Sequence, residues 1–146
     1  MEDIVDLKIQ SKLKNVSIVR VVVASILSNL NVTIDELSDI KTAVSEAVTN
    51  AIEHGYSTEN EIVEITIKTV QIDGMAYINV KVKDTGIGIE DITLATTPSY
   101  TSKPELEHAG FGFTIMETFM DELVIDSSPG VGTIISMTKK IRSIKA

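Results

Sequence analysis

Three polar residues that could do chemistry, Glu46, Asn50 and His54, recur at intervals of four in the segment SEAVTNAIEHGY. In an α-helix Asn50 would lie roughly 40° and His54 roughly 80° around from Glu46, so all three would border the apolar stripe. The amide oxygen of Asn50 is a hard, neutral ligand suited to Mg²⁺, which usually keeps waters and substrate phosphates as its other ligands. Glu46 could act as a general base or orient a metal-bound water. The alternative is a polar helix border with only local hydrogen bonds.

A second candidate group is Asp84 with the glycines that follow it, in the segment VKDTGIGIE. Asp84 ends a predicted strand, where its carboxylate could accept a hydrogen bond from an exocyclic amine such as that of adenine. Guanine presents a carbonyl at that position and would be disfavoured. Gly86 and Gly88 would let the backbone approach a base closely, or would only serve a loop that needs positive φ. No helix opens there with a third glycine, so the segment is not a dinucleotide-binding fingerprint.

A third candidate group is the segment HAGFGFTIMETF, in which Gly110 and Gly112 lie at the start of a predicted helix. Free backbone N–H groups and the helix dipole favour phosphate at such a position, although a flexible helix start would look the same. The chain has no GxxxxGK[ST] loop and no protein-kinase catalytic loop. A metal ligand, an adenine acceptor and a phosphate-binding helix start together predict a site for Mg-ATP on another scaffold.

The elements that must position these residues follow from hydrophobic periodicity. Ile4–Ile9 alternates and predicts a strand, and residues 15–30 predict a helix. A second helix is expected from the N-cap Thr33 to about Ala51, with Gly55 as a C′ stop. The remaining predicted elements are strands at 61–72 and 75–84 joined by the hairpin signal Asp73-Gly74, a helix at about 111–121, and strands at 123–128 and 132–140.

The long stretch after Asp84 is rich in Gly, Ser, Thr and Pro and predicts a binding loop or lid at about residues 89–110. The element order β-α-α-β-β-loop-α-β-β predicts the α+β class. The helices should cover one face of a mostly antiparallel sheet.

Length, charge and composition exclude several classes of function. A chain of 146 residues suits one domain, residues 1–146, and the absence of cysteine excludes disulfides and thiolate chemistry. Thirteen basic and 21 acidic residues give a net charge of −8, so we expect no direct binding of nucleic acid. The N-terminus lacks an apolar secretory core, and Arg20 breaks the longest apolar run. We therefore expect no membrane association and a cytoplasmic protein.

In this order the motifs resemble those of the GHKL ATP-binding superfamily, which includes histidine-kinase catalytic domains, gyrase B, Hsp90 and MutL. The pattern ExxxNAxxHG at Glu46–Gly55 resembles its N box. DTGIG at Asp84–Gly88 resembles its first glycine box, and GFGF at Gly110–Phe113 its second. Gly132-Thr133 matches a late-strand threonine that supports adenine recognition. The resemblance implies a Bergerat-type two-layer sandwich that binds ATP and Mg²⁺.

Within that superfamily, SEAVTNAIEHGY and KPELEHAGFGFTIMETFMDEL are similar to bacterial anti-sigma factors of the sporulation (sigma-F) type, which are also serine kinases. Such a family implies a homodimer that binds and inhibits a sigma factor when loaded with ATP. It also implies phosphorylation of a serine on an anti-anti-sigma factor, which inactivates that antagonist. Three alternatives stay open: a stress-response anti-sigma-B-type kinase, a detached histidine-kinase catalytic domain, and a nucleotide-gated sigma-binding protein with little kinase activity.

The resemblance also implies a role for each matching residue. Glu46 would be the catalytic base, Asn50 would hold Mg²⁺, and Asp84 would read adenine with the help of Thr133. The other nucleotide-binding residues would be Gly86 and Gly88 at the start of the lid, and Gly110, Phe111, Gly112 and Phe113 around the phosphates.

The resemblance also implies that the first helix is a partner-binding surface, with Arg20 as a charged anchor. The alternative is a residue that extends its charged end from the helix edge into solvent. The roles of His54, Lys103 and His108 stay open. The first strand, at Ile4–Ile9, is a candidate edge for pairing in a dimer.

Overall fold

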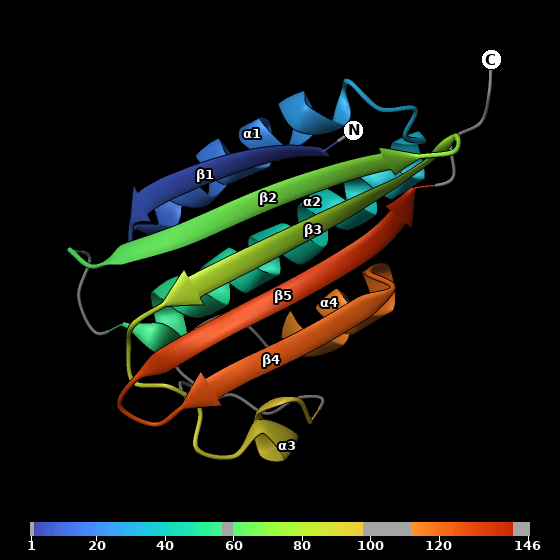
Figure 1. The fold of residues 1–146 in the computed structure, drawn as a ribbon. Helices are drawn as coiled ribbons and strands as arrows, with labels where there is room; N and C mark the ends of the chain where they lie inside the picture. Colours follow the sequence, from blue (N-terminus) through green and yellow to red (C-terminus); the bar gives the residue numbers. More distant parts are fainter. Residues whose placement is uncertain (1, 57–59, 98–111, 142–146) are drawn as a thin grey trace.

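The computed structural model describes residues 2–56, 60–97 and 112–141. Within these ranges a five-stranded sheet carries helices α1, α2 and α4 on one face (Figure 1). The strands are β1 (Glu2–Gln10), β2 (Ile62–Ile72), β3 (Met75–Asp84), β4 (Glu122–Ser128) and β5 (Gly132–Ile141). The helices are α1 (Val16–Leu27), α2 (Ile34–Asn50), α3 (Ile92–Ala95) and α4 (Gly112–Phe119), with a 3₁₀ turn η1 (Leu13–Asn15) and a π-helical turn η2 (Ala51–Gly55). The predicted α+β two-layer sandwich is confirmed.

The strand order is β1-β2-β3-β5-β4, and every neighbouring pair runs antiparallel. β1 lies at one edge, as predicted, and β4 at the other (Figure 1). β3 lies between β2 and β5, and the pairing of β3 with β5 puts Asp84 directly opposite Thr133. The chain therefore brings two predicted adenine-binding residues together at one end of the sheet.

The hairpin between β2 and β3 has the two-residue turn that the sequence predicts. Asp73 has φ 52° and Gly74 has φ 76°, and Ile72 pairs with Met75 across the turn. A type I′ turn requires positive φ at both central residues, which Asp-Gly tolerates better than most pairs. The turn therefore fixes the register that carries Asp84 to the end of β3.

The core lies between α2 and the sheet. Ile40, Val44 and Val48 of α2 are fully buried, as are Ile65 of β2 and Ile78 of β3. Full burial of such a side chain contributes about 1.5–3 kcal/mol, so these contacts fix the rotation of α2. That rotation carries the polar border of the helix toward the end of β3.

The start of α2 matches the prediction. Thr33 is the N-cap, its hydroxyl accepts from the backbone N–H of Glu36 at 3.0 Å, and the Glu36 carboxylate accepts from the Thr33 N–H at 3.0 Å. This reciprocal pair is a capping box, which satisfies two backbone donors that the helix leaves free. The first helix is shorter than predicted, because α1 begins at Val16 and ends at Leu27.

The predicted C′ stop at Gly55 is wrong. The α-helix ends at Asn50, the chain continues as the π-helical turn η2 to Gly55, and Tyr56 is extended. A Cβ on Gly55 would lie 2.8 Å from Cγ of Asp84, so close approach requires the glycine there. A π turn has i→i+5 hydrogen bonds and more residues per turn than an α-helix. The predicted position of His54, which assumed 100° of rotation per residue, therefore does not apply beyond Asn50.

None of the helices in the part of the chain that the structure describes is long and apolar enough to cross a membrane.

Candidate functional site

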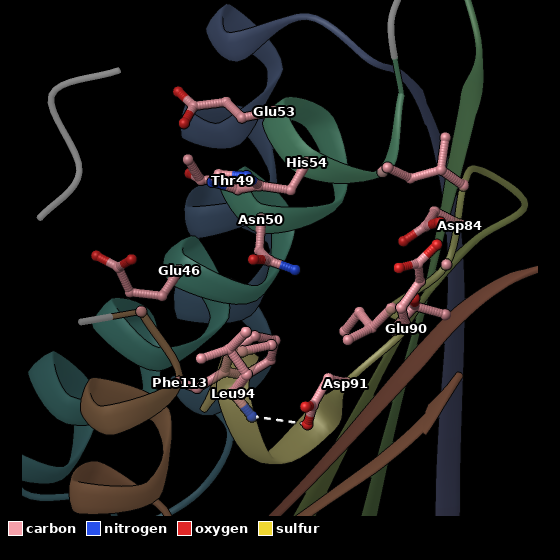
Figure 2. Close-up of a pocket in the computed structure, with 17 residues that line it drawn as sticks. Glu46, Thr49, Asn50, Glu53, His54, Asp84, Glu90, Asp91, Leu94 and Phe113 are labelled. Atoms are coloured by element: carbon pink, nitrogen blue, oxygen red, sulfur yellow. Dashed lines mark hydrogen bonds between the residues drawn. The ribbon is translucent and has the colours of Figure 1, made fainter. Parts of the chain in front are cut away.

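A cavity of about 360 Å³ opens between α2 with its η2 extension, the Asp84 end of β3, the segment after β3 and the start of α4 (Figure 2). Its volume falls in the range of small-molecule sites, roughly 300–1,000 Å³. The predicted site residues in its lining are Glu46, Asn50, His54, Asp84, Gly88, Gly112, Phe113 and Thr133. The structure therefore brings together residues that the sequence separates by up to 87 positions (133 − 46 = 87).

α2 contributes Glu46, Thr49 and Asn50 to one wall of this cavity, with Asn50 directed toward its centre (Figure 2). Glu46 faces the start of α4, where a Cβ on Gly112 would lie 3.3 Å from Glu46 Oε2. A Cβ at that position would be in tight contact with the end of the Glu46 side chain. A carboxylate and a helix N-terminus thus meet at the same side of the cavity.

Asp84 lies opposite this wall and is almost fully buried, with 5% of its surface exposed. Its Oδ1 accepts from the backbone N–H of Gly86 at 3.0 Å. Burial raises the pKa of the Asp84 carboxyl above its ordinary value, although backbone hydrogen bonds from Gly86 and Thr133 lower it in part. The buried carboxyl is therefore held in place by the main chain and directed at the cavity, where it can accept from an amine.

The turn after Asp84 is tied to the end of η2 by two contacts. The Tyr56 hydroxyl accepts from the Thr85 N–H at 2.7 Å and donates to the carbonyl of Ile62 at 2.8 Å. The Ile87 N–H donates to the carbonyl of Gly55 at 3.0 Å. A Cβ on Gly86 would lie 1.7 Å from that carbonyl oxygen, so only glycine allows the two segments to cross.

The predicted lid begins beside the cavity with the short helix α3. The Asp91 carboxylate accepts from the Leu94 N–H at 3.0 Å and caps α3, which lines the cavity with Leu94 and Ala95 (Figure 2). Four residues of the sequence analysis, Lys103, His108, Gly110 and Phe111, lie outside the described residues.

The lining is acidic. Carboxylates come from Glu46, Glu53, Asp84, Glu90 and Asp91, and no lysine or arginine is among the described residues that line the cavity. No group of three or more His, Cys, Asp or Glu in the ranges described could hold a metal ion by itself. A polyphosphate would therefore need a cation bound with it, held by one or two protein oxygens together with the phosphates and water. This is the usual coordination of Mg²⁺.

Several residues of this site are not among those predicted from the sequence. Thr49, Glu53, Glu90 and Asp91 line the cavity, and Tyr56 holds the turn after Asp84. Thr49 and Glu53 directly precede Asn50 and His54 in the sequence. Their position beside predicted site residues could have identified them. Tyr56 contacts residues far along the chain, and no local periodicity marks such a contact.

The family of histidine kinase-like ATPase domains matches residues 9–139 of this chain. Among solved structures, a Mycobacterium tuberculosis protein with RsbU and RsbW domains aligns with a TM-score of 0.61 at 19% identity. That alignment covers 99% of this chain and 34% of the longer one. The catalytic domain of the histidine kinase ThkA aligns with a TM-score of 0.51 at 17% identity, over 97% of this chain and 96% of that one. Fold and site thus define the class, a histidine kinase-like ATPase domain.

Relatives within this class are much closer in sequence. The chain is 52% identical to an anti-sigma F factor of Clostridium novyi (strain NT) over 136 residues, which are 92% of each chain. It is 47% identical to the anti-sigma F factor of Bacillus subtilis (strain 168) over 146 residues, 100% of this chain and 98% of the relative. The chain belongs to the anti-sigma F factor family of histidine kinase-like ATPases.

Proposed function

We propose that this protein is an ATP-dependent anti-sigma factor that binds and inhibits a sporulation sigma factor of the F type. We propose further that it is a protein-serine kinase, which phosphorylates and thereby inactivates an anti-anti-sigma factor. The observation that carries the proposal is the cavity that has Glu46 and Asn50 of α2 on one wall and Asp84 of β3 on the opposite wall, with Thr133 and the start of α4 also in its lining. The chain would act as one domain of residues 1–146, with a lid at about residues 89–110.

The residues of the cavity fit Mg-ATP. Asn50 offers a neutral oxygen ligand, Asp84 offers a buried acceptor, and Gly112 begins α4 beside Glu46. Bound here, ATP would supply the phosphoryl group and Mg²⁺ would neutralise its charge. Asn50 would hold the metal ion together with phosphates and water, and Asp84, aided by Thr133, would accept from the adenine amine.

The other nucleotide-binding residues surround these two. Gly86 and Gly88 shape the start of the lid, Phe113 lies at the phosphate end, and Gly110, Phe111 and Gly112 would supply backbone N–H groups to phosphate oxygens. Phosphoryl transfer needs mainly positioning and charge stabilisation from the protein. Among the described residues, α2, the end of β3 and the start of α4 all contribute to the lining of the cavity, which supports such positioning.

Glu46 is the proposed catalytic base, which would hold the proton of the substrate serine hydroxyl during transfer. Its carboxylate lies next to the start of α4, where the terminal phosphates would lie. We expect Glu46→Gln to slow transfer by about 10²- to 10⁴-fold, the usual contribution of a general base, with little change in ATP affinity. The measurement is the intact mass of an anti-anti-sigma factor after incubation with Mg-ATP and either protein.

One added phosphoryl group with the unchanged protein, and none with Glu46→Gln, is the expected result. Glu36→Gln is a matched control, because Glu36 sits in the capping box at the far end of α2. Equal transfer by the Glu46 variant would contradict its role. Bound ATP without any transfer would instead favour a nucleotide-gated protein that sequesters the sigma factor.

The partner surface that we propose is the exposed side of α1. Arg20 is exposed on this helix, and so are Ile18 and Val21, with 50% and 68% of their surfaces exposed. A helix that exposes one cation together with apolar side chains suits an acidic, partly apolar partner such as a helix of a sigma factor. For the homodimer we propose pairing through β1, the edge strand at the N-terminal side of the sheet. Because sigma factors act in transcription, the proposed place of action is the bacterial cytoplasm.

A further inference from the structure

Ser127 of β4 does not line the cavity, yet its hydroxyl contacts two residues that do. It accepts from the Ile89 N–H at 2.8 Å, and it lies 2.7 Å from the hydroxyl oxygen of Thr133. It also lies 3.1 Å from the carbonyl oxygen of Gly132. A single half-buried hydroxyl thus joins the beginning of the lid to the base of the proposed adenine site.

The chain before Ile89 runs closely along the β4–β5 turn. The Gly130 N–H donates to the carbonyl of Ile87 at 2.7 Å. A Cβ on Gly88 would lie 2.1 Å from the carbonyl oxygen of Ser128, so the two backbones are in contact there. The Ile89 bond to Ser127 is the last of these contacts before the chain turns into α3. Ser127 therefore marks the point where the lid segment leaves the sheet.

The proton count of the two hydroxyls restricts what Thr133 can offer to a ligand. A serine hydroxyl has one proton and two lone pairs, and the Ile89 N–H occupies one lone pair. If Ser127 donates to Gly132, Thr133 must donate to Ser127 and then presents only an acceptor to the cavity. If Ser127 donates to Thr133, the proton of Thr133 becomes available to a ring nitrogen of a base, directly or through a water.

We propose that Ser127 is a positioning residue that couples the start of the lid to the base-reading hydroxyl of Thr133. Adenine carries an acceptor nitrogen beside its amine, so its binding selects the arrangement in which Ser127 donates to Thr133. Ser127 keeps its acceptor role toward the Ile89 N–H in both arrangements, which holds the first residue of the lid against the sheet. The inference rests on the proposed binding of ATP and deepens it, because it assigns a residue of β4 to base recognition.

The test is a double-mutant cycle on nucleotide affinity, with Mg-ATP titrated into the full chain by calorimetry. We expect Ser127→Ala to weaken binding by about threefold to tenfold, the range for one neutral hydrogen bond. Ser127→Thr keeps the hydroxyl on a β-branched residue suited to a strand, and should restore the affinity. Ser128→Ala is the matched control, because Ser128 is the exposed next residue of the same strand.

The cycle is completed with Thr133→Val, alone and combined with Ser127→Ala. If Ser127 acts through Thr133, its substitution should have no further effect once the threonine hydroxyl is gone. Amide hydrogen exchange at Ile89, measured without nucleotide, should become faster in Ser127→Ala and stay unchanged in Ser128→Ala. A structural role alone would not make the affinity loss depend on Thr133.

The outcomes separate this inference from the proposed function. An equal loss of affinity from Ser127→Ala in both Thr133 backgrounds would overturn the coupling, as would no loss at all. Unchanged exchange at Ile89 would overturn the role in anchoring the lid. Failure of the unsubstituted chain to bind Mg-ATP would overturn the proposed function itself, and the exchange measurement would still test the anchoring.

Discussion

At the scale of single residues, the chemistry of the site depends on Asp84. Its carboxyl is buried at the end of β3, and that burial raises its pKa, while main-chain bonds from Gly86 and Thr133 offset part of the effect. An amine donor binds the ionised carboxylate more tightly than the protonated form. A ligand with that donor should therefore lower the pKa again and release a proton on binding.

We predict that adenosine binds more tightly as the pH rises through the raised pKa of Asp84, with a plateau above it. Affinity rises with pH because only the ionised carboxylate is purely an acceptor. Adenosine is the ligand of choice because it has no phosphate whose own titration would interfere. Asp84→Asn should weaken binding and remove the dependence on pH, which a series of calorimetric titrations between about pH 4 and 8 would measure. A parallel titration with ATP and GTP tests the same role, and equal affinities would contradict it.

Stability should respond to pH in the opposite direction. Because the pKa of Asp84 is higher in the folded state than in the unfolded chain, folding is favoured by this residue where it is protonated. That contribution is lost as the pH rises from the unfolded pKa through the folded one. The residue thus gives up stability at neutral pH in return for a fixed acceptor, as functional sites often do.

At the scale of elements, the site depends on where two backbone segments cross. Gly86 passes the carbonyl of Gly55 so closely that a Cβ would lie 1.7 Å from the oxygen. At Gly130 glycine is favoured by the backbone conformation and not by lack of space, since φ is +76° and nothing lies within 4 Å of an added Cβ. A substitution at Gly86 therefore tests the close crossing of the two segments, and a substitution at Gly130 tests backbone strain alone.

We predict that Gly86→Ala disrupts both folding stability and nucleotide binding, because α2 with η2 and the loop after β3 must move apart. Gly130→Ala is the matched control and should cost only about 1–2 kcal/mol of stability, the penalty for a left-handed residue with a Cβ. Its ATP affinity should stay unchanged. Thermal unfolding and ATP titration of both variants provide the measurement. Normal ATP affinity in Gly86→Ala would show that the crossing does not position the site.

At the scale of the whole molecule, both the chain and the lining of its cavity are acidic. The net charge is −8, and the described lining of the cavity contains five carboxylates without a lysine or arginine. A polyanion without a metal ion would be repelled both by the net charge of the chain and by the carboxylates of the cavity. Nucleotide binding should therefore depend strongly on Mg²⁺, and the proposed ligand Asn50 would hold the metal ion without adding negative charge.

We predict that Mg-ATP at about 100 times its dissociation constant stabilises the folded chain by about 2.7 kcal/mol, which corresponds to roughly 5–10 °C in the melting temperature. Chelation of the metal ion with EDTA should abolish most of this shift. Asn50→Ala should reduce the shift in Mg²⁺ and differ little from the unchanged protein in EDTA. Differential scanning calorimetry gives all four values, and an undiminished shift for Asn50→Ala would refute its role as metal ligand.

The sequence by itself determined the class of fold, and it predicted the chemistry of the motifs. Alternation and turn residues predicted the strands and the Asp73-Gly74 hairpin, and Thr33 predicted the start of α2, because these signals act over a few residues. The residue types of Glu46, Asn50 and Asp84 predicted a base, a metal ligand and an amine acceptor, respectively, for the same reason. Each depends on the chemistry of one side chain and its local spacing.

Tertiary structure alone decided how these residues meet and what holds them. A Cβ on Gly55 would clash with Asp84, the Tyr56 hydroxyl accepts from the Thr85 N–H, and the Ser127 hydroxyl accepts from the Ile89 N–H. These pairs are separated by 29 residues (84 − 55 and 85 − 56) and by 38 residues (127 − 89). Local periodicity carries no information about contacts at such separations, because strand pairing and the packing of α2 on the sheet create them only when the whole chain folds.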